Sequence, residues 1–525
     1  MNSHPGTEWK SSVNPWIIAA TVMLATFMEV LDTSIANVAL PHIAGSLSAS
    51  VDESTWVLTS YLVSNAIILP LTGWLSTLFG RKRFYMGCVI IFTLSSFLCG
   101  LAPNLPTLVA LRVIQGAGGG GLQPVSQAIL VESFDRKRQG MAMAVYGMGV
   151  VVAPIIGPTL GGWITDNYSW RWIFLINIPV GVISLLMTST LIKDPPYLVR
   201  KHLKELSIDF MGLGLLGVGL GFLQVMLDKG QRDDWFGSHF IVACAVLAVV
   251  GLVGVVLWEL RQKDPIVDLR LLKDKNFAVA TLTMFALGLV LYGTTVLLPI
   301  LAQTMLGYTA ELSGLVLSPG AVITMMTMPL VGWLLGRFEA RWLVVFGLVV
   351  LSIGMFRLAS INLNVSFWIL VGTWCISRAG LGFIFVPINV MAFYFVPKQK
   401  TNNATGIINV ARNVGGSVGI SLVTTLQGRF AQIHQNRLVS HLTPYDPAYR
   451  SFLGGSSQML QAAGSSAAQA SAQARGLIYS ELLRQASILS YIDVFWLLGI
   501  TCLVMIPLMF LLKRMRPGKA AVPAH

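Results

Sequence analysis

The feature that most constrains this chain is a series of apolar runs, each about 20 residues long, separated by short polar segments. A helix of about this length crosses the hydrocarbon core of a bilayer. Because 54% of the residues are hydrophobic and only 11% are charged, no water-soluble core could bury the apolar surface. The sequence therefore predicts an all-α polytopic membrane protein with fourteen transmembrane helices. The predicted spans are 16–38, 55–78, 84–103, 105–130, 140–163, 171–192, 209–228, 239–258, 277–301, 312–335, 342–360, 366–390, 403–426 and 488–512.

Basic residues fall mainly on alternate segments between these spans. The segments that share a side with the N-terminus include 81–83, 136–138, 193–204, 261–275 and 513–519. The short segments on the other side hold only Arg171, Lys229 and Arg232. Since cytoplasmic loops are enriched in Lys and Arg, this pattern predicts that both termini are cytoplasmic. The net charge of +13 thus indicates contact with the lipid bilayer, and no nucleic acid is expected as a partner.

Enzymatic chemistry is not indicated. The five cysteines lie in apolar runs without a C-x-x-C pair, so neither a disulfide framework nor a metal site is predicted. The seven histidines lie outside the centres of the predicted spans, and no phosphate-binding loop is present that would make ATP the energy source. We expect a secondary transporter without cofactor or metal, driven by the proton gradient. A membrane enzyme and a passive channel or receptor are the alternatives.

An internal repeat is visible across the chain. Gly73-Trp74-Leu75 recurs as Gly332-Trp333-Leu334, and Pro124 recurs as Pro387. Repeated halves around a central cavity are a transporter architecture. The predicted divisions are a six-helix half at 1–192, two extra helices with cytoplasmic linkers at 193–276, a second six-helix half at 277–515 and a cytoplasmic tail at 516–525. The second half includes a periplasmic loop at 427–487, for which a mobile linker and a helical element that contacts a partner are equally open.

Charged residues inside the predicted spans raise the free energy of membrane insertion, so each of them is a candidate functional residue. Asp32 lies about 24 Å along the first span from its inner end, and Arg112 lies about 10 Å from the outer end of the fourth. In a hydrocarbon core of about 30 Å, the two reach a similar depth, so an ion pair is possible. We favour a proton switch, in which the pair opens when Asp32 is protonated, over a static structural pair. Glu29 shares a helix face with Asp32 and is a second proton site, a substrate contact or part of a solvated wall.

A substrate cavity is predicted around Arg378 and Arg412, which lie inside the twelfth and thirteenth spans. Either arginine contacts substrate or pairs with the opposite half. Because spans nine to thirteen hold no central acid, we expect neutral compounds and weak acids to be preferred over dications. Glu132 lies near a helix end and is expected to reach water. Further polar residues predicted to line the cavity are Asn409, Gln115, Gln123, Tyr61, Asn65, Tyr292 and Gln303.

Several motifs together resemble the major facilitator superfamily. The segment from Gly73 to Arg83 matches its signature loop, although Thr77 stands where the family usually has an acid, so that the family's charge latch is in doubt here. Further motifs are similar to those of its fourteen-helix drug:proton antiporters, the family of the EmrB-like multidrug efflux pumps. They are 31–41, 111–116, 153–162, 170–181 and 264–269.

The resemblance implies proton-coupled export of small hydrophobic compounds across the cell inner membrane. It also implies a tripartite efflux system, with an EmrA-like periplasmic adaptor and a TolC-like outer-membrane channel as partners. The resemblance further implies that the glycine-rich motifs take part in the conformational change of transport. Ordinary tight helix packing, the alternative, would rely on the same close contacts between small residues. The residues of the glycine-rich motifs are Gly73, Gly80, Arg81, Arg83, Gly157, Pro158, Gly161 and Gly162.

Overall fold

The structure is a computed structural model that describes residues 13–135, 138–194, 209–262 and 265–513. Every regular element in these ranges is helical. This is expected of a chain surrounded by lipid, since an α-helix satisfies its own backbone hydrogen bonds. Parts of the basic segments used above for orientation, the whole predicted tail at 516–525 and residues 195–208 of the predicted division 193–276 lie outside the described residues.

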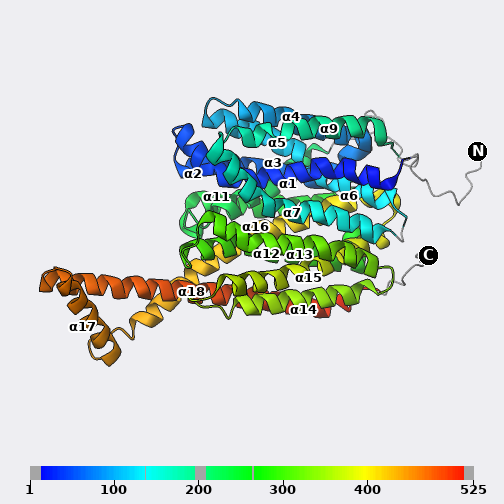
Figure 1. Cartoon of the computed structure of the whole chain (residues 1–525). Helices are drawn as coiled ribbons and strands as arrows, with labels where there is room; N and C mark the ends of the chain where they lie inside the picture. The colour runs from blue at the N-terminus through cyan, green and yellow to red at the C-terminus, as the bar shows by residue number, and fades with distance from the viewer. Residues whose placement is uncertain (1–12, 136–137, 195–208, 263–264, 514–525) are drawn as a thin grey trace, which may run out of the picture.

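The axes of the helices are roughly aligned, and the helices form one bundle (Figure 1). Both described chain ends lie at one end of the bundle, which we call the terminal end. The α-helices are α1 (Pro15–Ser46), α2 (Val51–Ser54), α3 (Trp56–Phe79), α4 (Arg81–Gly100), α5 (Leu105–Gly119), α6 (Leu122–Ser133), α7 (Gln139–Asn167), α8 (Trp172–Leu175), α9 (Asn177–Leu191), α10 (Phe210–Lys229), α11 (His239–Arg261), α12 (Lys275–Thr304), α13 (Ala310–Leu334), α14 (Ala340–Leu358), α15 (Phe367–Tyr394), α16 (Thr401–Val439), α17 (Pro447–Ala462) and α18 (Ala467–Met509). Short 3₁₀ turns lie at Trp235–Gly237, Leu269–Lys273 and Lys398–Lys400.

Each predicted span coincides with a helix or with two consecutive helices, but not all of them qualify as membrane spans. Within the described residues, 11 helices are long and apolar enough to cross a membrane, or 12 if the two segments of α7, bent by 42° near Pro154, are counted as one span. The predicted span 105–130 is divided between α5 and α6 at Gly120 and Gly121. The predicted span 403–426 lies in α16, which is rich in polar residues. The all-helical fold is confirmed, and the number fourteen stays a prediction.

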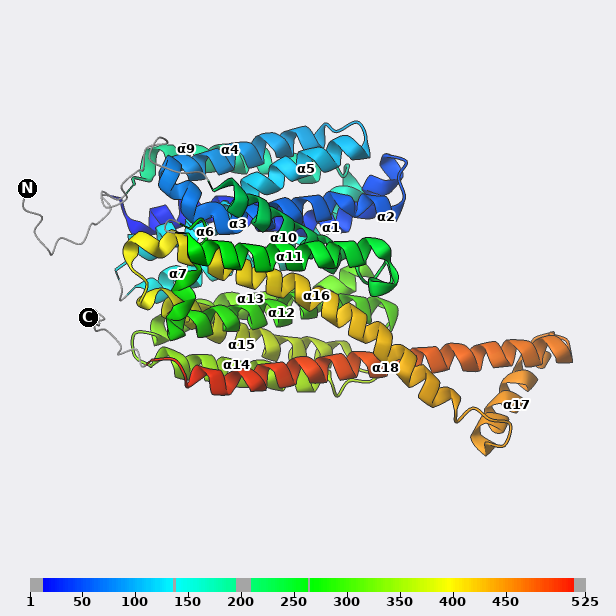
Figure 2. The ribbon, with the colours of Figure 1, turned by 180° about the vertical axis from the view of Figure 1, so that it is seen from behind.

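The region 427–487 is helical rather than a linker without structure. α16 continues to Val439, α17 follows, and α18 begins at Ala467, well before the predicted start of the last span at 488. Ser466 caps α18 through a reciprocal pair of hydrogen bonds with Gln469. We call residues 427–487 the helical arm; it extends beyond the bundle at the end opposite the termini (Figure 2). The low apolar content of this segment, which left a linker and a helical element equally open, reflects its position outside the bundle.

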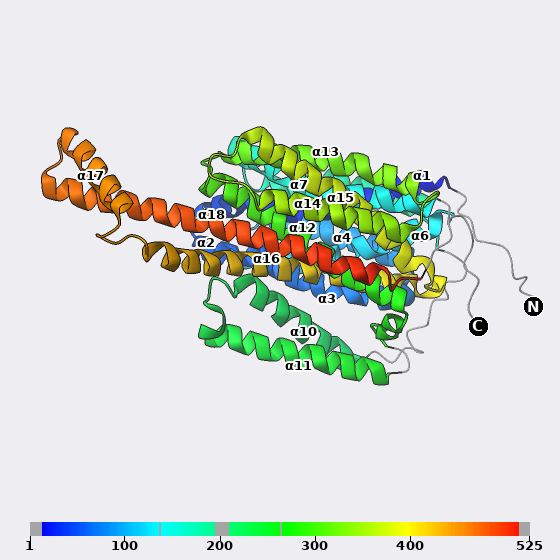
Figure 3. The ribbon, with the colours of Figure 1, turned by 90° about the horizontal axis from the view of Figure 1, so that it is seen from below.

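Two helices lie beside the halves rather than between them. α10 and α11 form a pair at one side of the bundle (Figure 3), and α10 packs against α3 of the first half and α16 of the second. Ser417 of α16 donates a hydrogen bond of 2.9 Å to Gln224 of α10. The two predicted extra helices therefore contact both halves along one edge of their interface.

The halves meet closely at the terminal end. α7 packs on α13 there, and a Cβ built on Gly140 would lie 2.9 Å from the carbonyl oxygen of Gly332. α3 packs on α16, and Gly73 leaves room for the side chain of Asn403, which any larger residue would displace. Glycine permits this approach because it has no side chain. The interface is thus closed at the end of the bundle where both chain termini lie.

Candidate functional site

The first candidate site is a buried polar cluster in the first half, formed by Asp32 of α1, Arg112 and Gln115 of α5, and Asn177 of α9. Arg112 Nη1 lies 2.6 Å from Asp32 Oδ2, and both side chains are at most 1% exposed. Asp32 Oδ1 accepts hydrogen bonds from Gln115 Nε2 at 3.1 Å and from Asn177 Nδ2 at 2.7 Å. We call these four residues the Asp32 cluster. Both oxygens of the carboxylate accept hydrogen bonds, and the arginine supplies the opposite charge that a buried carboxylate requires.

Arg112 is held in place from several directions. Its Nε donates to the carbonyl oxygen of Val57 at 3.1 Å, and its guanidinium lies 4.3 Å from the ring centroid of Tyr61 and 5.5 Å from that of Phe174. One turn along α5, a Cβ on Gly116 would lie 2.4 Å from the carbonyl oxygen of Tyr61. The glycine therefore lets α5 approach α3 closely enough for Arg112 to reach Asp32.

The second candidate site surrounds Glu29, one turn from Asp32 on α1. Glu29 Oε1 accepts hydrogen bonds from Tyr61 Oη at 3.0 Å and Asn65 Nδ2 at 3.2 Å, and Oε2 accepts one from Gln123 Nε2 at 2.6 Å. Gln123 Oε1 in turn accepts a hydrogen bond from Arg412 Nη2 of α16. We call these five residues the Glu29 cluster. It links a carboxylate of the first half to a guanidinium of the second through one amide side chain.

Tyr61 connects the two clusters. Its hydroxyl bonds to Glu29, while its ring lies against Arg112, the partner of Asp32. A change in the charge of either carboxylate therefore acts on a side chain that the other cluster also contacts. The electrostatic interaction is strong because these side chains are almost completely buried.

A third group of polar residues extends the contact between the halves. Gln127 of α6 donates to Asn389 of α15 at 2.5 Å and accepts from Asn409 Nδ2 of α16 at 2.7 Å. Tyr146 Oη of α7 donates to Asn409 Oδ1 at 3.1 Å, and its ring stacks on Phe385. All of these polar side chains are buried, so the interface of the halves is held by a hydrogen-bonded network and not by apolar packing alone.

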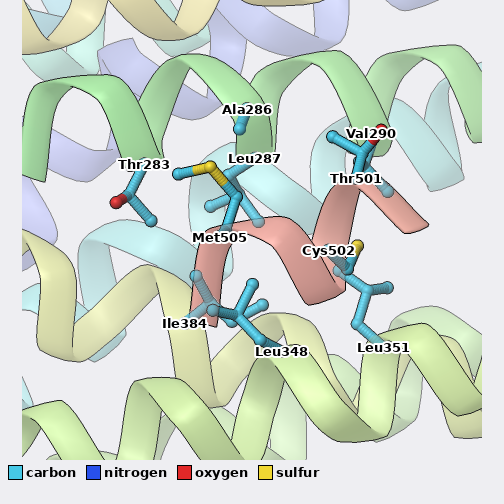
Figure 4. A pocket seen from close by; sticks show the side chains of 10 residues that line it. All are labelled: Thr283, Ala286, Leu287, Val290, Leu348, Leu351, Ile384, Thr501, Cys502 and Met505. Atoms are coloured by element: carbon cyan, nitrogen blue, oxygen red, sulfur yellow. The ribbon is translucent and has the colours of Figure 1, made fainter. Parts of the chain in front are cut away.

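Several predicted cavity residues occupy other positions. Gln303 is exposed near the end of α12, outside both clusters, so its predicted place in the cavity is wrong. Tyr292 packs against Gly416, close to Arg412 on α16. Arg378 belongs to neither cluster, and its side chain donates hydrogen bonds to Thr294 and Thr295 of the second half. An apolar pocket lies between α12, α14, α15 and α18, away from the charged clusters (Figure 4).

The signature loop after α3 has a charge pair that the sequence reasoning missed. Arg81 forms two hydrogen bonds with Glu132, at 2.6 and 2.8 Å, and the two side chains are 3% and 4% exposed. The expectation that Glu132 reaches water is therefore wrong.

The other residues of the signature loop have separate roles. Gly80, with a φ of 81°, makes the turn that starts α4, whereas Arg83 is exposed. Thr77 donates to the carbonyl oxygen of Gly73 in its own helix.

Changing Glu132 to Gln should lower the free energy of unfolding by about 3–5 kcal/mol, because it removes a carboxylate that forms two hydrogen bonds with the buried charge of Arg81. Thermal or denaturant unfolding of the purified chain would measure the loss. The matched control is Glu481→Gln, since Glu481 and Arg484 form an exposed pair at 3.9 Å that should contribute about 0–1 kcal/mol. Equal effects of the two changes would contradict a structural role for the Arg81–Glu132 pair.

The glycine motif of α7 packs against α1 beside Asp32. A Cβ on Gly157 would lie 2.3 Å from Ser34 Oγ, and one on Gly161 would lie 2.9 Å from Ile35 Cγ2. By contrast, no atom lies within 4 Å of a Cβ on Gly162, so the expectation of close packing at this residue is wrong. Pro158 lies inside α7 and, with Pro154, removes backbone donors that would keep the helix straight.

These neighbouring glycines provide a controlled test. Gly161→Ala should destabilise the protein by about 1–3 kcal/mol, because α1 and α7 must move apart to accept the methyl group. Gly162→Ala should be neutral or stabilise by up to about 1 kcal/mol, since alanine is the better helix former. The unfolding temperatures of the two variants, each compared with that of the wild type, measure these effects. Similar values for both would mean that α1 and α7 do not pack as described.

Asn177, Gln127, Asn389 and Tyr146 were not identified as functional from the sequence. Asn177 was visible as an amide in an otherwise apolar run, but the sequence does not show which helix an amide faces. The same holds for Gln127 and Asn389, whose partnership joins residues 262 positions apart.

Comparisons with known proteins agree with this architecture. Residues 22–420 match the model of the Major Facilitator Superfamily. The chain is 37% identical to "Multidrug export protein EmrB" of Haemophilus influenzae over 482 residues, 92% of each chain. It is 36% identical to "Fatty acid resistance protein FarB" of Neisseria gonorrhoeae, covering 96% of this chain and 97% of that one. The solved structure of the proton:xylose symporter XylE superposes with a TM-score of 0.60 at 13% identity, covering 96% and 97% of the chains, and this likeness concerns the fold alone.

Proposed function

The chain belongs to the major facilitator superfamily, and from this premise we propose that it is a proton-coupled antiporter that exports small hydrophobic compounds by alternating access between its two halves. The observation that carries the proposal is the buried ion pair of Asp32 and Arg112. A carboxylate that can exchange a proton in the interior of a membrane protein supplies the chemistry that coupling to a proton gradient requires.

The Asp32 cluster offers a way to convert protonation into movement. With Asp32 charged, its contacts with Arg112, Gln115 and Asn177 hold α1, α5 and α9 together. Protonation removes the negative charge, so the attraction to Arg112 is lost and one oxygen becomes a donor that faces the amide donors of Gln115 and Asn177. The packing of α1 against α5 and α9 is then weakened, and a rearrangement of the first half becomes accessible.

The Glu29 cluster couples this change to the second half. Gln123 is bonded to Glu29 on one side and to Arg412 on the other, and Tyr61 connects the cluster to Arg112. Opening of the interface at the terminal end requires that Gln123 releases Arg412 and that Gln127 releases Asn389 and Asn409. We propose that protonation of the first half favours this release. The proton is then exchanged at one side of the membrane and the substrate at the other.

The membrane arrangement is also part of the proposal. We infer fourteen spans, with α5 and α6 together and α16 as two of them, and cytoplasmic termini, which makes the terminal end the cytoplasmic one. The inferred location is the cell inner membrane, as the resemblance of the sequence motifs to the EmrB-like efflux pumps implies. The preference for neutral compounds and weak acids over dications follows from the arginines of the second half and the absence of a central acid there.

A direct test uses inverted membrane vesicles with an imposed pH gradient, acidic inside. Vesicles that contain the protein should accumulate a neutral dye such as Nile red, and an ionophore that dissipates the pH gradient should abolish this uptake. Uptake that is indifferent to the gradient would indicate a passive pathway and refute antiport. Competition by the dication methyl viologen as strong as that by decanoate would refute the substrate preference.

The helical arm is the proposed contact with an EmrA-like periplasmic adaptor, which in turn would engage a TolC-like outer channel. None of the described residues of α17 is buried, and its apolar side chains include Phe452 and Met459, which are 54% and 77% exposed. Replacing residues 440–466 by a short Gly/Ser linker should abolish co-purification with the adaptor and leave uptake by inverted vesicles intact. Retained co-purification would place the adaptor contact elsewhere.

A further inference from the structure

The second half contains a buried guanidinium of its own. Arg378 of α15 is 2% exposed, and its Nη2 donates to Thr294 Oγ1 at 3.1 Å and Thr295 Oγ1 at 3.0 Å. Its guanidinium lies 3.7 Å from the ring centroid of Trp374, and its Nε has no hydrogen-bond partner. Among the described residues, no carboxylate forms an ion pair with Arg378.

The repeat shows what Arg378 lacks. In each half an arginine reaches from the fourth span of that half to the first: Arg112 reaches from α5 to α1, and Arg378 reaches from α15 to α12. In the first half the acceptor is a carboxylate, Asp32. In the second half it is a pair of neutral hydroxyls, Thr294 and Thr295. The cation is therefore present in both halves, while among the described residues a protein anion accompanies it only in the first.

A buried guanidinium with only neutral partners is costly, because desolvation of the charge is not offset by an opposite charge. A role limited to holding α12 against α15 would be met by an amide at a lower desolvation cost. Charged residues inside membrane proteins usually mark sites of function. The retained charge of Arg378 thus favours a role in binding a charged ligand.

The surroundings of Arg378 hold its guanidinium in a defined plane. A Cβ on Gly320 of α13 would lie 2.6 Å from Trp374 Cδ1 and 2.8 Å from Arg378 Cγ, so only glycine allows this packing. Trp374 Nε1 donates to the carbonyl oxygen of Leu317 at 3.3 Å, and Thr324 donates to the carbonyl oxygen of Arg378 at 3.1 Å. A guanidinium fixed in this way is suited to a planar anion, which it binds with paired hydrogen bonds.

We propose that Arg378, with Thr294, Thr295 and Trp374, is a binding site for the carboxylate group of an anionic, amphipathic weak acid. The carboxylate takes the place beside Arg378 that Asp32 takes beside Arg112, and the indole ring contacts the apolar part of the ligand. This assignment rests on the proposed export function, since it names a substrate class and the residue that recognises it.

Binding of decanoate and of decanol, which share a ten-carbon chain, tests the proposal. The full chain is placed in nanodiscs of phosphatidylcholine, and both affinities are measured by titration at pH 7.5. Wild type should bind decanoate about 10- to 100-fold more tightly than decanol, the range expected for a hydrogen-bonded charge. Arg378→Met should remove this preference, and Arg378→Lys should retain part of it. The matched control is Arg337→Met, because Arg337 also stacks on a tryptophan, Trp333, but is exposed.

A second variant keeps the test decisive if Arg378→Met does not fold. Thr295→Asp places a carboxylate beside Arg378 and should raise the unfolding temperature while abolishing the preference for decanoate. A folded Arg378→Met or Thr295→Asp variant that still prefers decanoate as wild type does would overturn the proposal. The vesicle assay with Nile red is the separate readout of export. If it shows no gradient-driven uptake while decanoate binding still depends on Arg378, the export function fails and the binding site stands.

Discussion

Asp32→Asn should reduce gradient-driven export to the level of vesicles without the protein, while the chain remains folded and inserted. Asparagine has the shape of the protonated carboxyl and cannot lose a proton, so the Asp32 cluster stays in one charge state. Uptake of Nile red by inverted vesicles with an acidic interior measures the loss. Equilibration of the dye without a gradient should persist, because the halves can still rearrange.

The matched control for this change is Asp166→Asn, since Asp166 lies in the same half but its side chain is 70% exposed. It should export as wild type does. Undiminished uphill export by Asp32→Asn would remove Asp32 from the coupling mechanism.

A double variant separates a proton switch from a static pair. Asp32→Asn alone leaves Arg112 buried without its carboxylate, which should destabilise the protein by about 3–5 kcal/mol. Adding Arg112→Gln removes the uncompensated charge and should recover most of this loss, while export stays absent. If export returned together with stability, the pair would be structural only.

Gln123→Leu should have the second-largest effect, because this one side chain joins Glu29 of the first half to Arg412 of the second. Glu29 and Arg412 are both buried, and each would lose a hydrogen bond that contributes about 1–3 kcal/mol. The free energy of unfolding should therefore fall by roughly 2–6 kcal/mol. We expect gradient-driven export to fall at least about tenfold, since the halves are no longer linked at the level of Glu29. Unfolding temperature and vesicle uptake measure the two effects.

Gln139→Leu is the control for this variant. Gln139 donates to the carbonyl oxygen of Val131 within the first half, so it tests the loss of an amide that does not cross between halves. Gln139→Leu should lower the free energy of unfolding by about 1 kcal/mol and leave export unchanged. Wild-type stability and export in Gln123→Leu would show that the bridge has no part in the function.

A helical membrane protein could be predicted from the amino-acid sequence, because the length and apolarity of a spanning helix are local properties of the chain. The sequence also placed Asp32 and Arg112 at a similar depth, since the rise of a helix converts residue number into distance. The structure shows the two in contact, at 2.6 Å.

Which polar groups meet depends on how the helices pack, and this could not be predicted from the sequence. Depth along a helix does not give the rotation of that helix about its axis, and therefore the sequence could not show that Gln123 bridges to Arg412, that Arg81 pairs with Glu132, or that Gln303 is exposed. Nor could composition show that the polar region 427–487 forms the helical arm, because helices outside the bundle need no apolar surface. The sequence already showed that spans nine to thirteen hold no central acid, but only the packing of α12 against α15 shows that the partners of Arg378 there are the hydroxyls of Thr294 and Thr295.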